Sequence, residues 1–346
     1  MEIVKWGLSG CGDISRKRVA PAMRDLDIVD FVGVNRARFE LAEAFAEEFG
    51  ARKTYRKFSE MLADKEIHAV YIATPVNMHC EMTIAAAKAG KHVLCEKPMG
   101  LTTEECDKMI AACDENNVML GVAYYRHFYP AIARIKAILE SEEIGKAVFA
   151  QINAFEFFNP SPDDDRHWFV KKDIAGGGPM FDFGSHRIEV LLNVFGELKE
   201  TNGFIDSLRF QREVEDTGTA HFRFKSGVNA VLNVTHAAYE SQDTFDIFAT
   251  DGSIHVDNLN GGTLKIISRE VERVEVDGVE VEPVEEEGVE LERVEVERIE
   301  KCPPHENIHQ PLVEDFSRAL IYERNPDVSG IEGREVNKVE EDIFRK

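Results

Sequence analysis

The order of apolar and polar positions divides the chain into two parts. In the first part, short unbroken apolar runs alternate with stretches that have apolar residues at helical spacing. Unbroken apolar runs are typical of parallel strands covered on both faces, and their alternation with helices predicts a doubly wound parallel sheet. The predicted strands lie at 4–8, 28–34, 69–73, 93–95 and 118–122, and the predicted helices at 16–26, where Pro21 is expected to interrupt, 39–49, 80–89 and 104–115.

The pattern changes after residue 122, where strands predominate. One helix is predicted at 131–141 and another ends at Phe195, while two more are expected near 309–322 and around Val336, Val339 and Ile343. We therefore expect an α/β protein with three regions, 1–122, 123–304 and 305–346. The predicted strands of the second region lie at 147–157, 203–213, 217–225, 228–236, 244–249 and 253–257.

Residues 273–282 alternate valine with charged residues around Asp277-Gly278. An Asp-Gly pair between alternating residues is typical of a two-residue hairpin turn. The other face of this hairpin would be acidic and would resist edge-to-edge association. The turn would pair Val276 with Val279 and Val274 with Val281.

Composition narrows the class of protein. A chain of 346 residues, of which 43% are apolar and 30% charged, suits two globular domains. A net charge of −23 argues against nucleic acid or an anionic membrane as a partner. No apolar stretch is long enough to cross a bilayer, and the first residues read as a strand rather than a signal peptide. Six cysteines without metal-binding spacing indicate reduced thiols and a cytoplasmic location.

A glycine-rich turn follows the first predicted strand. Gly10 and Gly12 permit a tight turn whose backbone N–H groups can approach a pyrophosphate at the start of a helix. Ser15 stands where the dinucleotide-binding fingerprint has its third glycine, and it is small enough for close packing. The turn lies between the first strand and the first helix, as this fingerprint requires. An ordinary glycine turn is the alternative.

The second predicted strand ends at Asn35-Arg36-Ala37-Arg38. Sites that prefer NAD usually have a carboxylate here that binds the ribose 2′-hydroxyl. In this chain no carboxylate would repel a 2′-phosphate, and a guanidinium can bind one through paired hydrogen bonds. The sequence therefore predicts NADP(H) in preference to NAD(H). The alternative is that Arg36 and Arg38 only solvate the start of the next helix.

The strand at 93–95 runs directly into Glu96-Lys97-Pro98. Ligands bind at the carboxyl ends of strands in open α/β sheets, and Pro98 restricts the backbone before it. A surface salt bridge between Glu96 and Lys97 is the alternative. The residues predicted to bind the dinucleotide are Ser9, Gly10, Cys11, Gly12, Asp13, Ile14, Asn35, Arg36, Arg38, Ala73, Thr74, Pro75, Asn77, His79, Glu96, Lys97 and Arg126.

A second group of candidate residues lies in the region 123–304. Asp182 and His186 follow the triple glycine at 176–178, and their spacing of four puts them on one face of a helix. The glycines could instead form a plain loop, and His186 could be a hydrogen-bonded core residue.

Taken together, these segments resemble the glucose–fructose oxidoreductase, inositol dehydrogenase and rhizopine-catabolism (Gfo/Idh/MocA) family over nearly the whole chain. The resemblance implies a Rossmann domain followed by an α/β domain with a large open, mainly antiparallel sheet. It also implies a homodimer or homotetramer formed through that sheet, a frequently cis Lys97–Pro98 bond, and helices in 305–346 that pack back on the first domain. The matching segments are Gly10-Cys11-Gly12, Ala73-Thr74-Pro75, Glu96-Lys97-Pro98, Tyr124 to Pro130, and Trp168 through Gly176-Gly177-Gly178 to Asp182 and His186.

The family's catalytic lysine, aspartate and histidine correspond to Lys97, Asp182 and His186. The implied reaction moves a hydride between nicotinamide C4 and a carbinol carbon of a sugar or polyol. His186 would take the alcohol proton and Lys97 would stabilise the alkoxide, although the two could exchange roles. Asp182 would orient His186 or bind a neighbouring hydroxyl, and Glu96 would hold the ribose. The expected substrate residues are Tyr125, Arg126, Phe155, Trp168, Asp182 and His186.

Two positions depart from the family pattern and leave the substrate open. Tyr125 stands where the family often has asparagine, and Phe169 stands where arginine often follows the Trp168 position. An aldose or dihydrodiol substrate, a redox-neutral NAD-dependent glycosidase or epimerase, and a non-catalytic dinucleotide sensor are the alternatives. No metal is expected, because His305 and His309 lack a third ligand and are expected at the surface.

Overall fold

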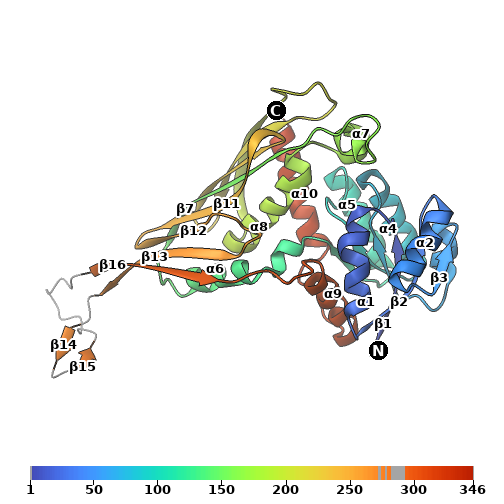
Figure 1. Ribbon diagram of the computed structural model, residues 1–346, viewed down its shortest axis with the longest axis horizontal. Helices are drawn as coiled ribbons and strands as arrows, with labels where there is room; N and C mark the ends of the chain where they lie inside the picture. Colours follow the sequence, from blue (N-terminus) through green and yellow to red (C-terminus); the bar gives the residue numbers. More distant parts are fainter. Residues whose placement is uncertain (1, 272–273, 277–278, 282–292, 346) are drawn as a thin grey trace.

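The computed structural model describes residues 2–271, 274–276, 279–281 and 293–345. Two large sheets form its framework, the six-stranded sheet A on the right of Figure 1 and the eight-stranded sheet B on the left. Sheet A is parallel and sheet B is mostly antiparallel. The predicted α/β fold, a Rossmann-type sheet followed by a large, mainly antiparallel one, is therefore confirmed.

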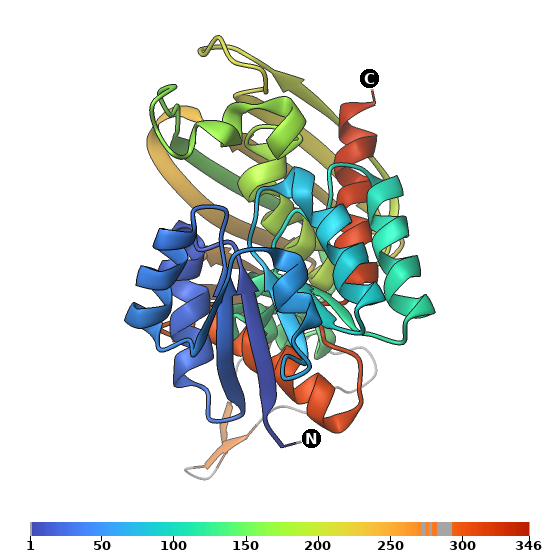
Figure 2. The same ribbon diagram turned by 90° about the vertical axis from the view of Figure 1, so that its right-hand side faces the viewer.

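Sheet A has the strand order of a Rossmann fold. Its strands are β1 (Val4–Ser9), β2 (Val29–Asn35), β3 (Lys53–Tyr55), β4 (Ala69–Ile72), β5 (His92–Cys95) and β6 (Leu120–Val122), arranged as β3-β2-β1-β4-β5-β6. Its helices are η1 (Ser15–Val19), α1 (Ala20–Asp25), α2 (Phe39–Phe49), α3 (Phe58–Ala63), η2 (Val76–Met78), α4 (His79–Lys88) and α5 (Thr103–Glu115). They flank both sides of the strands (Figure 2). The order reverses between β1 and β4, which is where such sheets bind ligands.

Two local features of sheet A differ from the sequence expectations. Pro21 is the second residue of α1, directly after the π-helical η1, and the residues before it already have helical backbone angles. It therefore marks the junction of two helical segments rather than an interruption. The short edge strand β3 was not predicted, because Lys53, Thr54 and Tyr55 are all half-buried and form no apolar run.

Sheet B contains one parallel pair, β7 with β10, among antiparallel neighbours. Its strands are β7 (Ala147–Phe157), β8 (Leu198–Asp206), β9 (Thr217–Phe224), β10 (Asn229–Thr235), β11 (Ala237–Ala249), β12 (Gly252–Val256), β13 (Thr263–Val271) and β16 (Arg293–Lys301), in the order β16-β13-β12-β11-β7-β10-β9-β8. The helices of this region are η3 (Tyr125–Phe128), α6 (Pro130–Glu140), η4 (His167–Val170), α7 (Lys172–Ala175), η5 (Met180–Gly184) and α8 (Ser185–Phe195).

The strand predicted at 203–213 is shifted in the structure to β8, which ends at Asp206. The cause is the buried Asp216, whose carboxylate accepts hydrogen bonds from the backbone N–H groups of Leu208, Arg209 and Phe210. Because these groups are bound by a side chain, they cannot pair with a neighbouring strand. β11 likewise begins at Ala237, earlier than the predicted residue 244.

The two faces of sheet B differ strongly in how far their side chains are buried. Alternate positions such as Ala150, Ile152 and Ala154 are fully buried, whereas the residues between them are only half-buried. In the described part of the chain, helices lie on one face of this sheet only (Figure 1). On the opposite, outer face, hydrogen-bonded amide and hydroxyl side chains cross four strands; they are Thr219, Asn233, Asn153 and Thr244.

The predicted valine hairpin is confirmed at the level of the backbone. β14 (Val274–Val276) and β15 (Val279–Val281) pair antiparallel, with Val276 opposite Val279 and Val274 opposite Val281. The Asp277-Gly278 turn lies outside the described residues.

Two C-terminal helices, α9 (Gln310–Tyr322) and α10 (Gly330–Phe344), complete the fold. α9 packs on sheet A, where the ring of Phe316 lies 5.5 Å from that of Trp6 in β1 and Ser317 Oγ accepts a hydrogen bond from Trp6 Nε1. α10 contacts α5 as well as β8 and α8, so it lies between the two sheets (Figure 1). α9 thus packs against the first domain, whereas α10 contacts both parts of the molecule.

No helix in the described ranges combines the length and apolar character needed to cross a membrane.

Candidate active site

The glycine turn after β1 lies at the reversal point of sheet A. Gly10 has φ +95°, and a Cβ there would lie 2.3 Å from the carbonyl oxygen of Ala73, so only glycine fits. A Cβ at Gly12 would meet no atom within 4 Å, so the space beside this turn is open. An open space lined by a glycine backbone at the start of a helix fits the pyrophosphate of a dinucleotide.

Asn35, the last residue of β2, and Arg36, which follows it, are both held by hydrogen bonds. Arg36 donates from Nη1 to the carbonyl oxygen of Cys11 at 2.8 Å, which holds its guanidinium against the glycine turn. Asn35 is buried, and its amide accepts from Ser9 Oγ and donates to the carbonyl oxygen of Tyr55. Asn35 and Ser9 were both expected to bind the cofactor, but their side chains are occupied in holding the turn against β2 and β3.

His79 joins the loops that follow β4 and β5. Its ring nitrogens lie 2.9 Å from the carbonyl oxygen of Thr74 and 3.0 Å from that of Pro98, and the side chain is buried. Burial lowers the pKa of His79, against the opposing effect of the two carbonyl contacts. Its side chain was predicted to contact the cofactor; in the structure it fixes the backbone on both sides of Lys97 instead. Asn77 is exposed at the same edge.

Lys97 connects the two parts of the molecule. From the end of β5, its Nζ donates to the carbonyl oxygen of Asp182 at 2.8 Å and to Asp182 Oδ1 at 3.2 Å. Both side chains are mostly buried, so this contact is shielded from solvent. The Lys97–Pro98 peptide is cis, as the resemblance implied. The structure therefore brings Asp182 to Lys97, and the described residues include no hydrogen bond or ion pair between Asp182 and His186.

Glu96 is a buried carboxylate beside Lys97. It accepts a hydrogen bond from Tyr71 Oη at 2.8 Å and lies 3.6 Å from Nε2 of His309. Burial favours the neutral acid, but His309, the charge of Lys97 and the bond from Tyr71 together lower the pKa of Glu96 below its ordinary value. Glu96 is thus an anionic acceptor at the same carboxyl edge of sheet A as the glycine turn, which suits a ribose hydroxyl donor.

The prediction that His309 lies at the surface was wrong. Its side chain is 1% exposed, and its ring lies 4.7 Å from that of Tyr125. His309 precedes Leu312 and Val313 by three and four positions, so the apolar face of α9 continues through it. That spacing was a usable signal in the sequence. His305 is exposed, as expected.

The ring of Tyr125 contacts two imidazole rings. The ring of His186 lies 4.5 Å from it and that of His309 lies 4.7 Å from it. Arg126 donates to Tyr125 Oη at 2.7 Å and to Asn260 Oδ1 at 3.1 Å, and it is 5% exposed. Arg126, predicted to contact both cofactor and substrate, here fixes Tyr125.

His186 is buried on the first turns of α8, where Nδ1 has no hydrogen-bond partner. Burial is the main cause of a strongly lowered pKa, and the nearby positive charge of Lys97 adds to it. Its ring is therefore neutral near neutral pH, with a lone pair that can accept a proton.

Phe155 of β7 was expected to contact the substrate. Glu156, its neighbour on β7, lies beside Asp182, with its Oε1 3.7 Å from His236 Nε2. Because successive side chains of a strand point to opposite faces, Phe155 points to the outer face of sheet B. Trp168 stacks on Phe169 at a ring distance of 3.8 Å.

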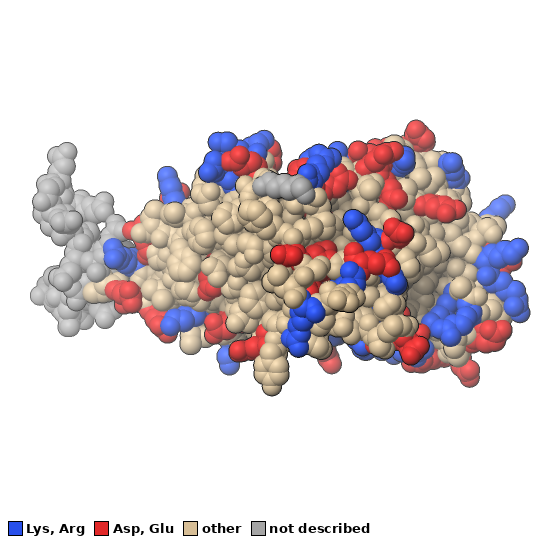
Figure 3. Space-filling view, turned by 90° about the horizontal axis from the view of Figure 1, so that it is seen from above, with Lys and Arg blue, Asp and Glu red and all other residues tan. Residues whose placement is uncertain are grey.

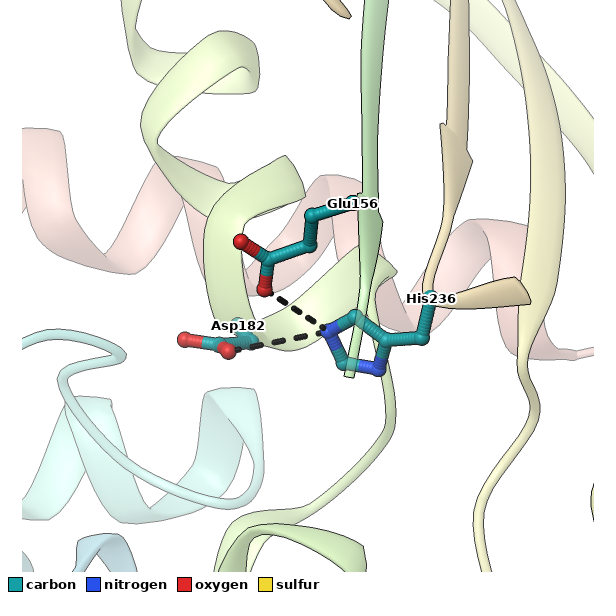
Figure 4. Close-up of side chains that lie close together, drawn as sticks. All are labelled: Glu156, Asp182 and His236. Atoms are coloured by element: carbon teal, nitrogen blue, oxygen red, sulfur yellow. Dashed lines mark ion pairs between the residues drawn. The ribbon is translucent and has the colours of Figure 1, made fainter. Parts of the chain in front are cut away.

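His236, which directly follows β10, lies close to Glu156 and Asp182. It was not identified from the sequence as a candidate site residue. Arg212 Nη2 lies 2.9 Å from its Nδ1, and a guanidinium can only donate. Nδ1 must therefore accept, and the proton of the neutral ring is on Nε2, which faces Asp182 Oδ2 at 3.8 Å and Glu156 Oε1 at 3.7 Å (Figure 4). Burial lowers the pKa of His236 to about 4, although the charge of Asp182 raises it.

Glu156, Asp182 and His236 are the group in the described residues that could hold a metal ion. A histidine that binds metal through Nε2 normally donates its other N–H to an acceptor. Here the other nitrogen receives a hydrogen bond from Arg212, and the ammonium group of Lys97 lies against Asp182. Both features disfavour a cation at this position.

Comparisons with known proteins identify the family to which the chain belongs. The family described as "Oxidoreductase family, NAD-binding Rossmann fold" matches residues 4–124, and the GFO/IDH/MocA C-terminal domain matches residues 132–255. The 1,5-anhydro-D-fructose reductase of Ensifer adhaerens is 30% identical over 254 residues, 72% of this chain and 74% of that protein. Levoglucosan dehydrogenase of Pseudarthrobacter phenanthrenivorans is 31% identical over 240 residues, 62% of each.

A solved structure shares the complete fold. Levoglucosan dehydrogenase in complex with NADH and levoglucosan superposes with a TM-score of 0.83 at 23% identity, covering 99% of this chain and 96% of that one. The protein is thus an oxidoreductase with an NAD-binding Rossmann domain. It belongs to the Gfo/Idh/MocA family.

The neutral state of His236 makes stability depend on pH. With a pKa of about 4 in the folded protein and an ordinary value of 6.5 in the unfolded chain, the unfolded chain binds the proton first as the pH falls. The stabilisation is therefore complete above pH 6.5 and is lost towards pH 4. At about pH 5 the loss is about 2 kcal/mol relative to about pH 7.

His236→Gln, which does not titrate, should remove this part of the pH dependence. Urea unfolding at the two pH values measures it, with His221→Gln, at an exposed histidine of β9, as the matched control. An equal loss in the wild type and in His236→Gln would contradict the assignment.

Proposed function

We propose that the protein transfers a hydride between a nicotinamide cofactor and a CH–OH group of a sugar or polyol. The observation that carries this proposal is the position of Lys97. Its ammonium group lies at the end of β5, on the same carboxyl edge of sheet A as the glycine turn after β1, and is held by Asp182 from the second domain. The names of the relatives, a levoglucosan dehydrogenase, a 1,5-anhydro-D-fructose reductase and a myo-inositol 2-dehydrogenase, support a sugar or polyol substrate.

The chain's own residues supply binding and proton transfer, while a bound nicotinamide supplies the hydride chemistry. Two of the three N–H donors of Lys97 are directed at Asp182, so the third is free for the substrate oxygen. A positive charge at that oxygen stabilises the alkoxide that forms as the alcohol is oxidised. The neutral ring of His186 takes the alcohol proton. This division of roles uses the charged state of Lys97 and the uncharged state of His186.

The proposed activity is tested by titrating the protein with NADPH and NADH and screening neutral sugars and polyols with the tighter cofactor. Turnover accompanied by stoichiometric change in nicotinamide absorbance supports the proposal. A cofactor that stays bound and unchanged while a glycosidic bond is cleaved would replace it with redox-neutral chemistry. Binding of cofactor without turnover of any substrate would favour a sensor.

Lys97→Met should abolish turnover while leaving the cofactor site intact. Loss of the charge at the substrate oxygen is expected to lower kcat by about 10²–10⁴-fold. The Kd for the reduced cofactor, followed by nicotinamide fluorescence, should change by less than about threefold, because the glycine turn is untouched. Lys88→Met, at an exposed lysine of α4, is the control. Wild-type turnover in Lys97→Met would rule out the assignment.

NADP(H) is the proposed cofactor, because Arg36 is held at the glycine turn and no carboxylate follows β2. A charge-assisted bond to the 2′-phosphate should make the Kd for NADPH lower than that for NADH by roughly tenfold to a hundredfold. Arg36→Gln should reduce this ratio, while Arg24→Gln, at an exposed arginine of α1 that pairs with Asp25, should not. Tighter binding of NADH by the wild type would overturn the preference.

We further propose that the outer face of sheet B joins two or more copies of the chain. This face carries exposed apolar side chains such as Phe248 and Ile299, 43% and 63% exposed. Over sheet B, on the left of Figure 3, few charged side chains interrupt the surface. Sedimentation velocity should give a dimer or tetramer that Phe248→Glu dissociates and that Leu208→Glu, on an exposed loop, leaves intact. A monomeric wild type would contradict this assembly.

A further inference from the structure

We propose that Glu156, Asp182 and His236 form a subsite for two neighbouring hydroxyl groups of an uncharged sugar or polyol, and that this subsite rejects anionic substrates. The proposal rests on the function proposed above and specifies the substrate class. Glu156 and His236 have no role in the hydride transfer itself.

The first observation is an unpaired donor that points into the group. His236 is fully buried, and its Nε2 has no hydrogen-bond partner within the described residues. A buried N–H group without an acceptor costs free energy unless another group enters. The carboxylate oxygens of Glu156 and Asp182 face this nitrogen, but at 3.7 and 3.8 Å both are beyond hydrogen-bond length (Figure 4).

The distances between the three groups suit a ligand oxygen that hydrogen-bonds to all of them. The three facing atoms lie within 4.8 Å of one another. One oxygen between them can therefore reach all three at about 2.8 Å, an ordinary hydrogen-bond length. Gaps of this size between polar groups typically hold a bridging water or ligand group.

The donor is held rigidly in one protonation state. Arg212 donates to His236 Nδ1 and also to the carbonyl oxygens of Phe158 and Glu215. The imidazole also contacts two phenyl rings, 5.0 Å from that of Phe158 and 5.1 Å from that of Phe183. Nε2 therefore presents an N–H group, in a fixed direction, to whatever occupies the space.

The hydrogen-bonding pattern matches a pair of hydroxyl groups. One hydroxyl can accept from His236 Nε2 and donate to Asp182, while its neighbour donates to Glu156. Every polar group then has a partner, and recognition of this kind discriminates strongly against ligands that lack one. Asp182 also binds Lys97, so the subsite adjoins the oxygen at which hydride transfer is proposed.

The same pattern excludes anions. A carboxylate or phosphate has no hydrogen to donate to Glu156 and Asp182, and its charge would lie against theirs in a partly buried site. Burial and the charge of Asp182 already raise the pKa of Glu156, which shows how poorly further negative charge is tolerated. An ammonium group could donate to both carboxylates but would leave the His236 donor unpaired.

The test compares neutral sugars with their acidic counterparts, glucose with glucuronate and galactose with galacturonate, on the protein loaded with cofactor. Binding by calorimetry and turnover are measured in parallel. The wild type should prefer the neutral member by at least about 100-fold in kcat/KM. Glu156→Gln should raise KM for the neutral sugar by about tenfold with kcat little changed, and it should reduce the neutral-to-acidic ratio by about tenfold.

Three further variants separate the effect of hydrogen bonding from the effects of charge and of folding. Glu240→Gln removes the same charge at an exposed position of β11 and should leave the ratio unchanged. His236→Gln retains an N–H donor and should stay within about threefold of the wild type, whereas His236→Leu should raise KM by about 10–100-fold. If His236→Leu does not fold, the Glu156→Gln ratio still decides.

The possible outcomes are distinct. Turnover with an unchanged ratio in Glu156→Gln, or a wild type that prefers the acidic sugar, overturns the subsite and leaves the proposed function standing. Neutral sugars that bind selectively through Glu156 without turnover uphold the subsite and overturn the proposed function. Sugar binding that is lost in EDTA and restored by Zn²⁺ or Mg²⁺ would show a metal site and overturn the proposal.

Discussion

The contact between Lys97 and Asp182 is the constraint on which the site depends. Lys97 ends a strand of sheet A, and Asp182 lies in a helical turn below sheet B, yet they meet through two hydrogen bonds. A mostly buried ammonium group needs an acceptor, and here the acceptor belongs to the other part of the molecule. The position of the Lys97 ammonium group therefore depends on how the two sheets pack against each other. Small changes in that packing would displace this positive charge.

Around this charge, the structure keeps imidazole rings uncharged. His186 and His236 are buried and have lowered pKa values. They differ in what holds them: aromatic rings contact His186, whereas Arg212 fixes the tautomer of His236. One ring is therefore suited to accepting a proton and the other to donating a hydrogen bond without ionising.

Much of the fold could be predicted from the sequence because it depends on local patterns. Unbroken apolar runs marked the parallel strands, and Lys97 was identified because it directly follows one. The errors have physical causes that are not local. Phe155 was expected in the sugar site because aromatic rings suit a sugar, whereas the face of β7 on which its side chain lies depends on which side of sheet B the helices cover. Asn35 could not be recognised as engaged, because its acceptor on Tyr55 comes from a strand that the pattern did not reveal.

His309 and Phe316 come from far along the chain, yet they contact Tyr125 and the first strand of sheet A. Domains fold as units during synthesis, with the N-terminal part first. The parallel sheet can therefore form while the surface around Trp6 still lacks its cover, and it keeps this apolar surface until α9 emerges from the ribosome. A nascent chain of this protein can have a complete glycine turn but not a complete active site. The tendency of the nascent chain to aggregate thus depends on how quickly the residues after sheet B are translated.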